Sequence, residues 1–190
     1  MTQDDVLSLF RRSGALLEGH FRLSSGLHSP GYLQSALVLQ SPPDAARLGE
    51  ALGARLRGAG ATAVLSPALG GIVIGHEVAR ALGVRAIFAE RQEGKLTLRR
   101  GFSLSPDDRV VVVEDVVTTG LSTRETIDVA TSAGATVVAA ASIVDRSGGA
   151  SLGVPYHALL PMSLPTYEAA ECPLCAQGMT VTKPGSRSGG

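Results

Sequence analysis

The feature that most constrains the fold is a run of four valines at 110–113, followed at once by the carboxylates Glu114 and Asp115. Continuous β-branched residues suit a strand that is buried on both faces, as in a parallel sheet covered by helices. Open sheets of this kind bind ligands at the carboxyl ends of their strands. The run therefore predicts an α/β fold with a central parallel sheet flanked by helices, and it places both carboxylates at the ligand-binding edge.

A loop of small residues, Thr118, Thr119 and Gly120, comes next, and Ser122 and Glu125 have the spacing of a capping box that opens a helix. Such a junction presents unpaired N–H groups and the positive end of a helix dipole, which suits a phosphate monoester. The preceding carboxylates would repel phosphate and are expected to face hydroxyls or a divalent cation. A ribose 5′-phosphate satisfies both halves, although a plain polar turn between strand and helix is the alternative.

A second junction of the same kind lies earlier in the chain. A short apolar stretch at 62–65 predicts a buried strand, a small-residue loop follows at 66–71, and a helix is expected at 72–82, ending at Gly83. The loop predicts a second anion site, with a glycine hinge needed for packing as the alternative. Two such sites in one sheet fit a ligand with phosphates at both ends.

The segment at 90–102, after a predicted strand at 84–89, is polar, interrupted by glycines and rich in basic residues. This composition predicts a hairpin or a mobile lid, and a solvated charged loop is the alternative. Helices are further expected at 4–12, 42–56 and 122–133, and strands at 136–144 and 156–160. Alternation at 21–32 favours an edge strand or a hood, broken by Gly26, Pro30 and Gly31.

Asp145 and Arg146 follow the strand predicted at 136–144. The guanidinium could form a structural ion pair with Asp145, or its planar fork could clamp a substrate carboxylate or paired carbonyls. The residues alone leave both possibilities open.

The overall composition describes one globular domain over residues 1–190, with a tail from about residue 183 that is expected to be flexible. Its 17 basic and 17 acidic residues give no electrostatic footprint for nucleic acid. No stretch approaches the roughly 18 apolar residues of a membrane span, and the acidic start differs from a signal peptide. A cytoplasmic protein is expected.

Two cysteines, Cys172 and Cys175, form a lone C-P-L-C. They could be half of a zinc site completed by a second subunit, or a redox-active pair. Nothing nearby in the sequence supports either, so reduced cysteines without a catalytic role are expected.

The sequence E-D-V-V-T-T-G at 114–120 resembles the phosphoribosyl pyrophosphate signature of type I phosphoribosyltransferases. The pattern F-x-L-S-S-G-x-x-S at 21–29 is similar to the hood of orotate phosphoribosyltransferases, and the loop at 66–71, the basic segment and Asp145-Arg146 occur in that family's order. The resemblance covers most of the chain. It implies a type I phosphoribosyltransferase-like fold with a small hood, formed mainly by residues 1–40 and a C-terminal segment.

The family resemblance implies transfer of a phosphoribosyl group from 5-phosphoribosyl 1-pyrophosphate to N1 of orotate with Mg²⁺, in pyrimidine (UMP) biosynthesis. It implies a homodimer in which the lid, carrying Arg91 and Lys95, reaches pyrophosphate across the interface, with Lys95 as the catalytic residue. No protein residue is expected to bind the metal directly. The substrate-binding residues that it implies are Glu114 and Asp115 for the ribose hydroxyls, Val116, Val117, Thr118, Thr119, Gly120, Leu121 and Ser122 for the 5′-phosphate, Thr118 and Arg146 for orotate, and Arg91 for pyrophosphate.

Two alternatives remain beside this interpretation. A purine phosphoribosyltransferase would share the signature but need a different base pocket. A regulator that binds phosphoribosyl pyrophosphate without turnover would usually carry a nucleic-acid-binding surface, against which the neutral charge and the lack of an appended helix-turn-helix argue.

Overall fold

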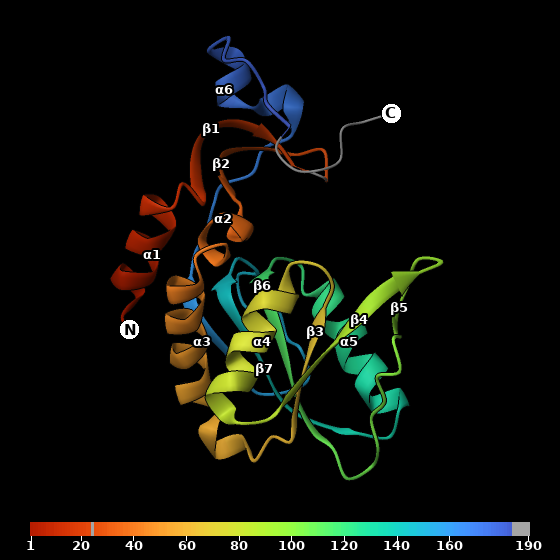
Figure 1. The fold of residues 1–190 in the computed structure, drawn as a ribbon. Coiled ribbons are helices and arrows are strands. Elements are labelled where there is room, and N and C mark those ends of the chain that lie inside the picture. Colours follow the sequence, from red (N-terminus) through yellow and green to blue (C-terminus); the bar gives the residue numbers. More distant parts are fainter. Residues whose placement is uncertain (24, 184–190) are drawn as a thin grey trace.

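The computed structural model describes residues 1–23 and 25–183, so most of the tail that was expected to be flexible lies outside the described residues (Figure 1). The helices are α1 (Gln3–Arg12), α2 (Ser35–Leu39), α3 (Pro42–Leu56), α4 (Gly71–Leu82), α5 (Leu121–Ser132) and α6 (Pro173–Ala176), with short 3₁₀ turns at Arg57–Ala59 and Ala169–Glu171. The strands are β1 (Leu16–Arg22), β2 (His28–Leu33), β3 (Ala63–Pro67), β4 (Arg85–Gln92), β5 (Lys95–Leu98), β6 (Arg109–Val117), β7 (Thr136–Asp145) and β8 (Tyr156–Pro161).

The main sheet has the strand order β5-β4-β3-β6-β7-β8, and its pairs are parallel except for β4 with β5. This confirms the predicted central sheet. From β3 the chain moves outward to β4, whereas from β6 it moves outward in the other direction to β7 and β8. The strand order therefore reverses between β3 and β6, the position at which open α/β sheets bind ligands.

The valine run is buried on both faces, as predicted. Val111 and Val113 pack in the core that contains residues of α3 and α4, while Val110 and Val112 pack in a second core with residues of α5. The helices cover opposite faces of the sheet (Figure 1). All four side chains are fully buried, and each burial contributes roughly 1.5–3 kcal/mol, so the run fixes β6 in the middle of the sheet.

Strands β1 and β2 pair with each other in a separate antiparallel sheet that stands apart from the main sheet (Figure 1). We call this hairpin the hood. The C-terminal segment lies against it, because Phe21 bridges to Thr182 and His28 bridges to Tyr167. Residues from the two ends of the chain thus build one small layer.

The expected breaks at Pro30 and Gly31 are wrong, because both residues lie inside β2. Pro30 has no partner in the β1–β2 register, which shifts between Glu18 and Phe21, so a residue without an N–H is tolerated there. Gly31 is placed where a Cβ atom would lie 3.0 Å from the side chain of Leu164. Close packing of the C-terminal segment, which is distant in sequence, explains this glycine.

The remaining elements agree closely with expectation. The polar segment at 90–102 forms a hairpin, since β4 extends to Gln92 and pairs antiparallel with β5. Helices α2 and α6 were not predicted, because they have only five and four residues and neither has a side-chain cap to mark its start. None of the described helices is long and apolar enough to cross a membrane.

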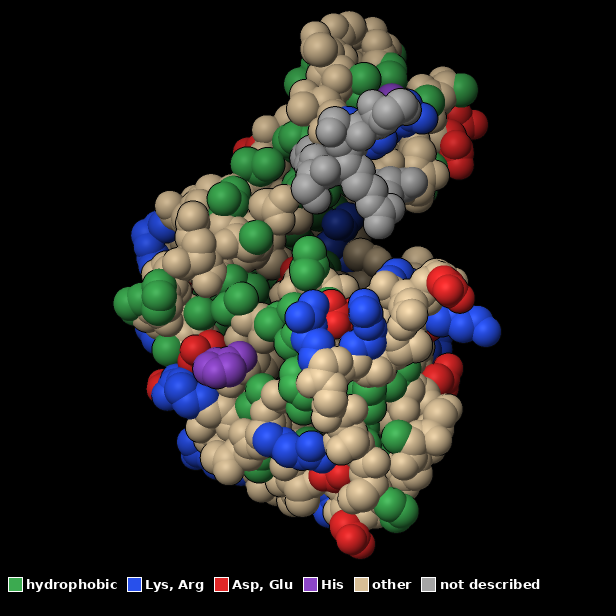
Figure 2. Space-filling view, turned by 45° about the vertical axis from the view of Figure 1, so that its right-hand side comes forward, with side chains coloured by type: hydrophobic (Ala, Val, Ile, Leu, Met, Phe, Trp, Pro, Cys, Tyr) green, Lys and Arg blue, Asp and Glu red, His purple; other side chains and the backbone are tan. Residues whose placement is uncertain are grey.

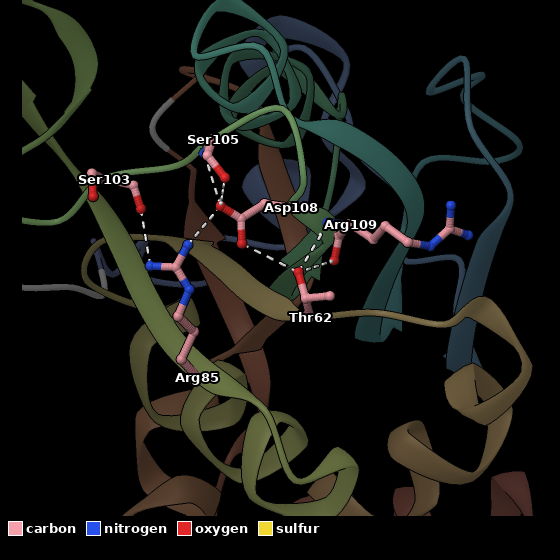
Figure 3. A network of polar contacts seen from close by, with 6 residues as sticks. All are labelled: Thr62, Arg85, Ser103, Ser105, Asp108 and Arg109. Atoms are coloured by element: carbon pink, nitrogen blue, oxygen red, sulfur yellow. Dashed lines mark hydrogen bonds and ion pairs between the residues drawn. The ribbon is translucent and has the colours of Figure 1, made fainter.

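A polar network ties together the amino ends of the central strands (Figure 3). Arg85 Nη2 donates to Asp108 Oδ2 at 2.8 Å, Ser105 donates to the same oxygen, and Thr62 Oγ1 lies 3.2 Å from Asp108 Oδ1. The Arg85 guanidinium is the main reason why the pKa of Asp108 falls to about 2. This network is structural, because it lies at the sheet edge opposite to the carboxyl ends.

Candidate active site

The two predicted anion loops meet where the strand order reverses. The loop after β3 contains a cis peptide between Ala68 and Leu69 and leads into α4, whose N-cap, Gly70, makes no side-chain cap bond. A Cβ atom on Gly70 would lie 2.7 Å from Oδ1 of Asp115 in β6. The first loop therefore packs directly against Asp115, the signature carboxylate on the α4 face of the sheet.

The predicted capping box at Ser122 and Glu125 is wrong. Helix α5 begins one residue earlier, because Gly120 adopts a left-handed conformation (φ 74°) as the N-cap and makes no side-chain cap bond. The Glu125 carboxylate instead accepts a hydrogen bond from Arg91 Nη2 at 2.5 Å. In the first turn of α5, Leu121 N donates to Thr119 Oγ1 at 3.3 Å, and the N-cap Gly120 offers no side chain. The other N–H groups of this helix start suit an external anion.

Glu114 and Asp115 point to opposite faces of β6, as successive residues of a strand must. Glu114 accepts a hydrogen bond from the Thr123 hydroxyl of α5, and burial raises its pKa to about 7, with the charge of Asp115 adding to the effect. Burial also raises the pKa of Asp115, on the other face. Each carboxylate is thus held where a hydroxyl donor or a cation would stabilise its charge.

A cavity of 630 Å³ lies between the hood and the carboxyl edge of the sheet. Figure 2 shows the surface hollowed at this place. Its walls come from the hood side, including Leu23, Leu27 and Tyr32, and from the sheet edge. The predicted site residues that line it are Asp115, Val116, Thr118, Thr119 and Arg146.

Arg146 supplies positive charge to this cavity. Its backbone N–H donates to Val117 O at 2.8 Å, which anchors the residue beside the end of β6. Burial lowers the pKa of the guanidinium, and its Nε is buried without a hydrogen-bond partner among the described residues. The Asp145 carboxylate accepts from Ser147 N at 2.8 Å, and no ion pair with Arg146 occurs in the described part of the chain. Arg146 therefore has donor capacity that a ligand could use.

Arg91 and Lys95 do not line this cavity. Arg91 is held in the β4–β5 hairpin by Glu125 and by Gly94 O, which accepts from Nη1 at 2.7 Å. Lys95 is exposed and borders a separate cavity of 470 Å³ beside Glu125 and Asp128 of α5. Figure 1 shows this hairpin projecting from the side of the molecule. Within one chain, the structure therefore separates the predicted lid residues from the other predicted site residues.

Sequence reasoning missed two polar residues of this region. Ser35 lines the cavity near Asp115, and its buried hydroxyl acts on that carboxylate, partly offsetting the rise in the pKa of Asp115. Thr123 is fully buried and donates to Glu114. No motif marks Ser35, whereas Thr123 sits just past the signature and could have been included in it.

Comparison with known proteins places the chain in a family. A family profile described as the phosphoribosyl transferase domain matches residues 38–153. An orotate phosphoribosyltransferase of Heliobacterium modesticaldum is 56% identical, over 99% of this chain and 100% of the relative. That of Pelotomaculum thermopropionicum is 52% identical, over 98% of this chain and 99% of the relative.

Solved structures agree with this placement. The orotate phosphoribosyltransferase from Aeropyrum pernix has a TM-score of 0.67 at 30% identity, covering 83% of this chain and 93% of that chain. The Mycobacterium tuberculosis enzyme in complex with 5-phospho-α-D-ribosyl 1-diphosphate shares the fold, with a TM-score of 0.66 at 24% identity over 84% of this chain and 95% of that chain. The signature, the fold and the 52–56% sequence identity over nearly the full length together show that the chain belongs to the orotate phosphoribosyltransferase family.

Proposed function

We propose that this protein transfers the phosphoribosyl group of 5-phosphoribosyl 1-pyrophosphate to N1 of orotate, giving orotidine 5′-monophosphate and pyrophosphate on the route to UMP. The names of relatives that are 52% and 56% identical support this activity. The structural observation that carries it is that Asp115 and Arg146 line the same cavity, at the point where the strand order reverses.

The phosphoribosyl half of the substrate suits the signature loop. Asp115 would accept hydrogen bonds from ribose hydroxyls, and the uncapped start of α5 with residues 116–122 would hold the 5′-phosphate. Glu114 faces α5 on the opposite side of β6. It would either accept a hydrogen bond from a ribose hydroxyl or hold the signature loop in place through its hydrogen bond with Thr123. The uncapped start of α4 beside Asp115 suits the pyrophosphate end.

The base half suits orotate better than a purine. Orotate carries a carboxylate, and the planar guanidinium of Arg146 can donate two parallel hydrogen bonds to it. A half-buried guanidinium with an unmatched Nε favours an anionic base over a neutral one. Thr118 lines the same cavity and can add a hydroxyl contact.

In the reaction, the leaving pyrophosphate gains negative charge while the ribose gains oxocarbenium character. Positioning and cationic stabilisation therefore do most of the work. The family implies Mg²⁺, and the cavity fits it, because Asp115 presents carboxylate oxygens there that could hold water bound to the ion. When bound, Mg²⁺ would stabilise charge on the pyrophosphate. The orotate dianion is already nucleophilic, so no strong protein base is required at N1.

The same proposal assigns the β4–β5 hairpin to a lid that acts in a homodimer. Arg91 and Lys95 lie away from the cavity of their own chain, and Lys95 is exposed at the start of β5. A hairpin that projects from the body can deliver these cations to the pyrophosphate of a partner subunit. Lys95 would then meet the charge that develops on the leaving group.

One assay tests the activity. Purified protein is mixed with phosphoribosyl pyrophosphate, Mg²⁺ and either orotate, adenine, hypoxanthine or xanthine, and loss of each base is followed. Consumption of orotate alone is expected. Turnover of a purine in place of orotate would support the purine enzyme, and tight binding of phosphoribosyl pyrophosphate without turnover of any base would support the regulator.

A further inference from the structure

Four potential metal ligands from the two ends of the chain meet in the hood. His20 comes from the end of β1, His28 opens β2, and Cys172 and Cys175 belong to the C-P-L-C of the C-terminal segment. One ligand atom from each side chain lies within 4.8 Å of all the others. The half site that the sequence left without partners is thus completed within the same chain.

Three of the six distances between these atoms already match a compact tetrahedral site, and all six are within 4.8 Å. His20 Nε2 lies 3.5 Å from Cys172 Sγ and 3.7 Å from Cys175 Sγ, and His28 Nδ1 lies 3.3 Å from Cys175 Sγ. Zinc with bonds of about 2.05 Å to nitrogen and about 2.3 Å to sulfur separates its ligand atoms by roughly 3.3–3.8 Å. The two ring nitrogens, at 2.9 Å, would need to part by only about 0.4 Å.

A backbone hydrogen bond holds the His20 ring in the tautomer and orientation of a metal ligand. Its Nδ1 lies 2.9 Å from the backbone oxygen of Met179, which can only accept, so Nδ1 carries the proton. The lone pair of neutral His20 therefore sits on Nε2, the atom that faces the other three side chains. Metal-binding histidines almost always use their second nitrogen in this way, because the outer hydrogen bond fixes the tautomer and the ring orientation.

A short turn places the two sulfur atoms together. Ala176 N donates to Cys172 O at 3.1 Å and Gly178 N donates to Cys175 O at 2.9 Å, so the chain folds back around the C-P-L-C. A C-x-x-C in such a turn is a common way to present two thiolates to one structural zinc.

The C-terminal segment has little else to hold it together. Over 168–183, Cys172 is the one buried residue and Leu174 is half-buried, while the remaining residues are exposed. A segment that buries so little apolar surface needs another source of stability, and small folded pieces often obtain it from a metal ion. The backbone bonds of Thr182 with Arg22 and His20, both within 2.9 Å, join its far end to β1.

From this geometry we propose that His20, His28, Cys172 and Cys175 bind one Zn²⁺ in a structural, four-coordinate site. Two thiolates and two imidazoles are a ligand set that selects zinc over the hard cations Mg²⁺ and Ca²⁺. All four positions are filled by protein, so no place remains for a water or a substrate, and the metal has no chemistry to perform.

The site also bears on the substrate cavity. His20 and His28 flank the tip of the hood hairpin, and Leu23, Ser25 and Leu27 from that tip line the cavity that contains Arg146. A metal that joins both sides of the hairpin would hold the tip in place. This consequence, unlike the zinc site itself, rests on the proposed function.

The first experiment measures metal directly and needs no activity. The full-length protein is prepared with a thiol reductant, incubated with Zn²⁺ and dialysed, and its zinc is quantified by mass spectrometry. About one zinc per chain is expected. Replacement by Co²⁺ should produce the intense visible and near-ultraviolet absorption of tetrahedral cobalt bound to thiolates. Substoichiometric zinc, or cobalt spectra without thiolate bands, would overturn the proposal.

Variants locate the site. Cys175→Ser and His20→Ala should each lower the retained zinc to below about 0.2 per chain. His76→Ala is the matched control, because His76 is exposed on α4 and lies outside the cluster, and it should keep about one zinc per chain. Full zinc retention by both cluster variants would place the metal elsewhere. Since Cys175 is exposed, its variant is expected to fold, and the wild-type measurement stands whether or not His20→Ala does.

A third measurement separates the site from the reaction. Removing zinc with a chelator should lower the melting temperature, and it should raise KM for orotate more than it lowers kcat, because the hood tip becomes less ordered. An unchanged melting temperature would overturn the structural role. Stoichiometric zinc in a protein that does not consume orotate would leave the site intact and reject the proposed function instead.

Discussion

Gly70 and Asp115 lie so close together that a Cβ atom on the glycine would be 2.7 Å from a carboxylate oxygen of the aspartate. Gly70 comes from the loop that follows β3, and Asp115 lies near the carboxyl end of β6; the order of the sheet reverses between these two strands. The contact therefore ties the first anion loop to the signature. Any side chain at position 70 has to displace Asp115 or the loop itself.

Gly70→Ala is accordingly expected to weaken binding of phosphoribosyl pyrophosphate by about tenfold or more, which corresponds to about 1.4 kcal/mol. Isothermal titration measures it. Gly58→Ala is the matched control, because a Cβ atom at Gly58 meets no atom within 4 Å, and its affinity should be that of the parent protein. Equal affinity of the Gly70 variant and the control would show that Asp115 is not held by this contact.

Arg146→Lys should weaken orotate binding much more than binding of phosphoribosyl pyrophosphate. An ammonium is a point charge and cannot reproduce a bidentate fork, and the loss of one charge-assisted hydrogen bond costs about 1.5–3 kcal/mol. Separate titrations with each substrate decide it. In the control Arg109→Lys, the replaced guanidinium donates to Gly60 O and Ala59 O away from the cavity, so both affinities should persist. Equal weakening of both substrates by Arg146→Lys would remove Arg146 from the orotate pocket.

Glu114 should make the ligand-free protein less stable as the pH rises from about 4.5 to about 7. Burial raises its folded pKa to about 7 from an ordinary value of 4.5, so in this window the folded protein keeps a proton that the unfolded chain releases. The loss amounts to up to about 3 kcal/mol. Urea denaturation at several pH values measures the slope, and Glu114→Gln should reduce it, leaving the part due to Asp115, whose pKa burial also raises.

Asp108→Asn is the control for that experiment, because the pKa of Asp108 is shifted the other way, to about 2 from 3.8. Its contribution is present above pH 3.8 and is lost as the pH falls through about 2. This variant should be less stable at neutral pH yet keep the slope between about pH 4.5 and about pH 7. A slope that is as steep in Glu114→Gln as in the parent protein would assign the effect to another group, such as Asp115.

Lys95→Ala should lower turnover while leaving orotate affinity nearly unchanged, because the ammonium is expected to meet charge that grows in the transition state. Mixing these subunits with Asp115→Asn subunits should restore part of the activity. Each hybrid dimer then contains one site with an intact lid and an intact cavity. Steady-state rates before and after verified subunit exchange measure this. A normal rate for Lys95→Ala without recovery on mixing would move the lid role to another residue, such as Arg91.

The sequence by itself determined the parts of this protein that depend on neighbouring residues. The valine run predicted a strand buried on both faces, and the small-residue loops predicted helix starts at the carboxyl edge, because strand burial and turn formation follow from local side-chain shape. The motif at 114–120 predicted the family to which the chain belongs. The start of α5 was placed wrongly, because Gly120, in a left-handed conformation, is the N-cap instead of Ser122.

Only the tertiary structure decided which distant residues meet. It matched Arg91 with Glu125, and it left Arg146 without a partner from Asp145. It also brought Cys172 to His20 across 152 positions of the chain. Such contacts depend on how strands and terminal segments pack. No local pattern encodes that packing, because the residues around each partner would be the same if its side chain were exposed to solvent.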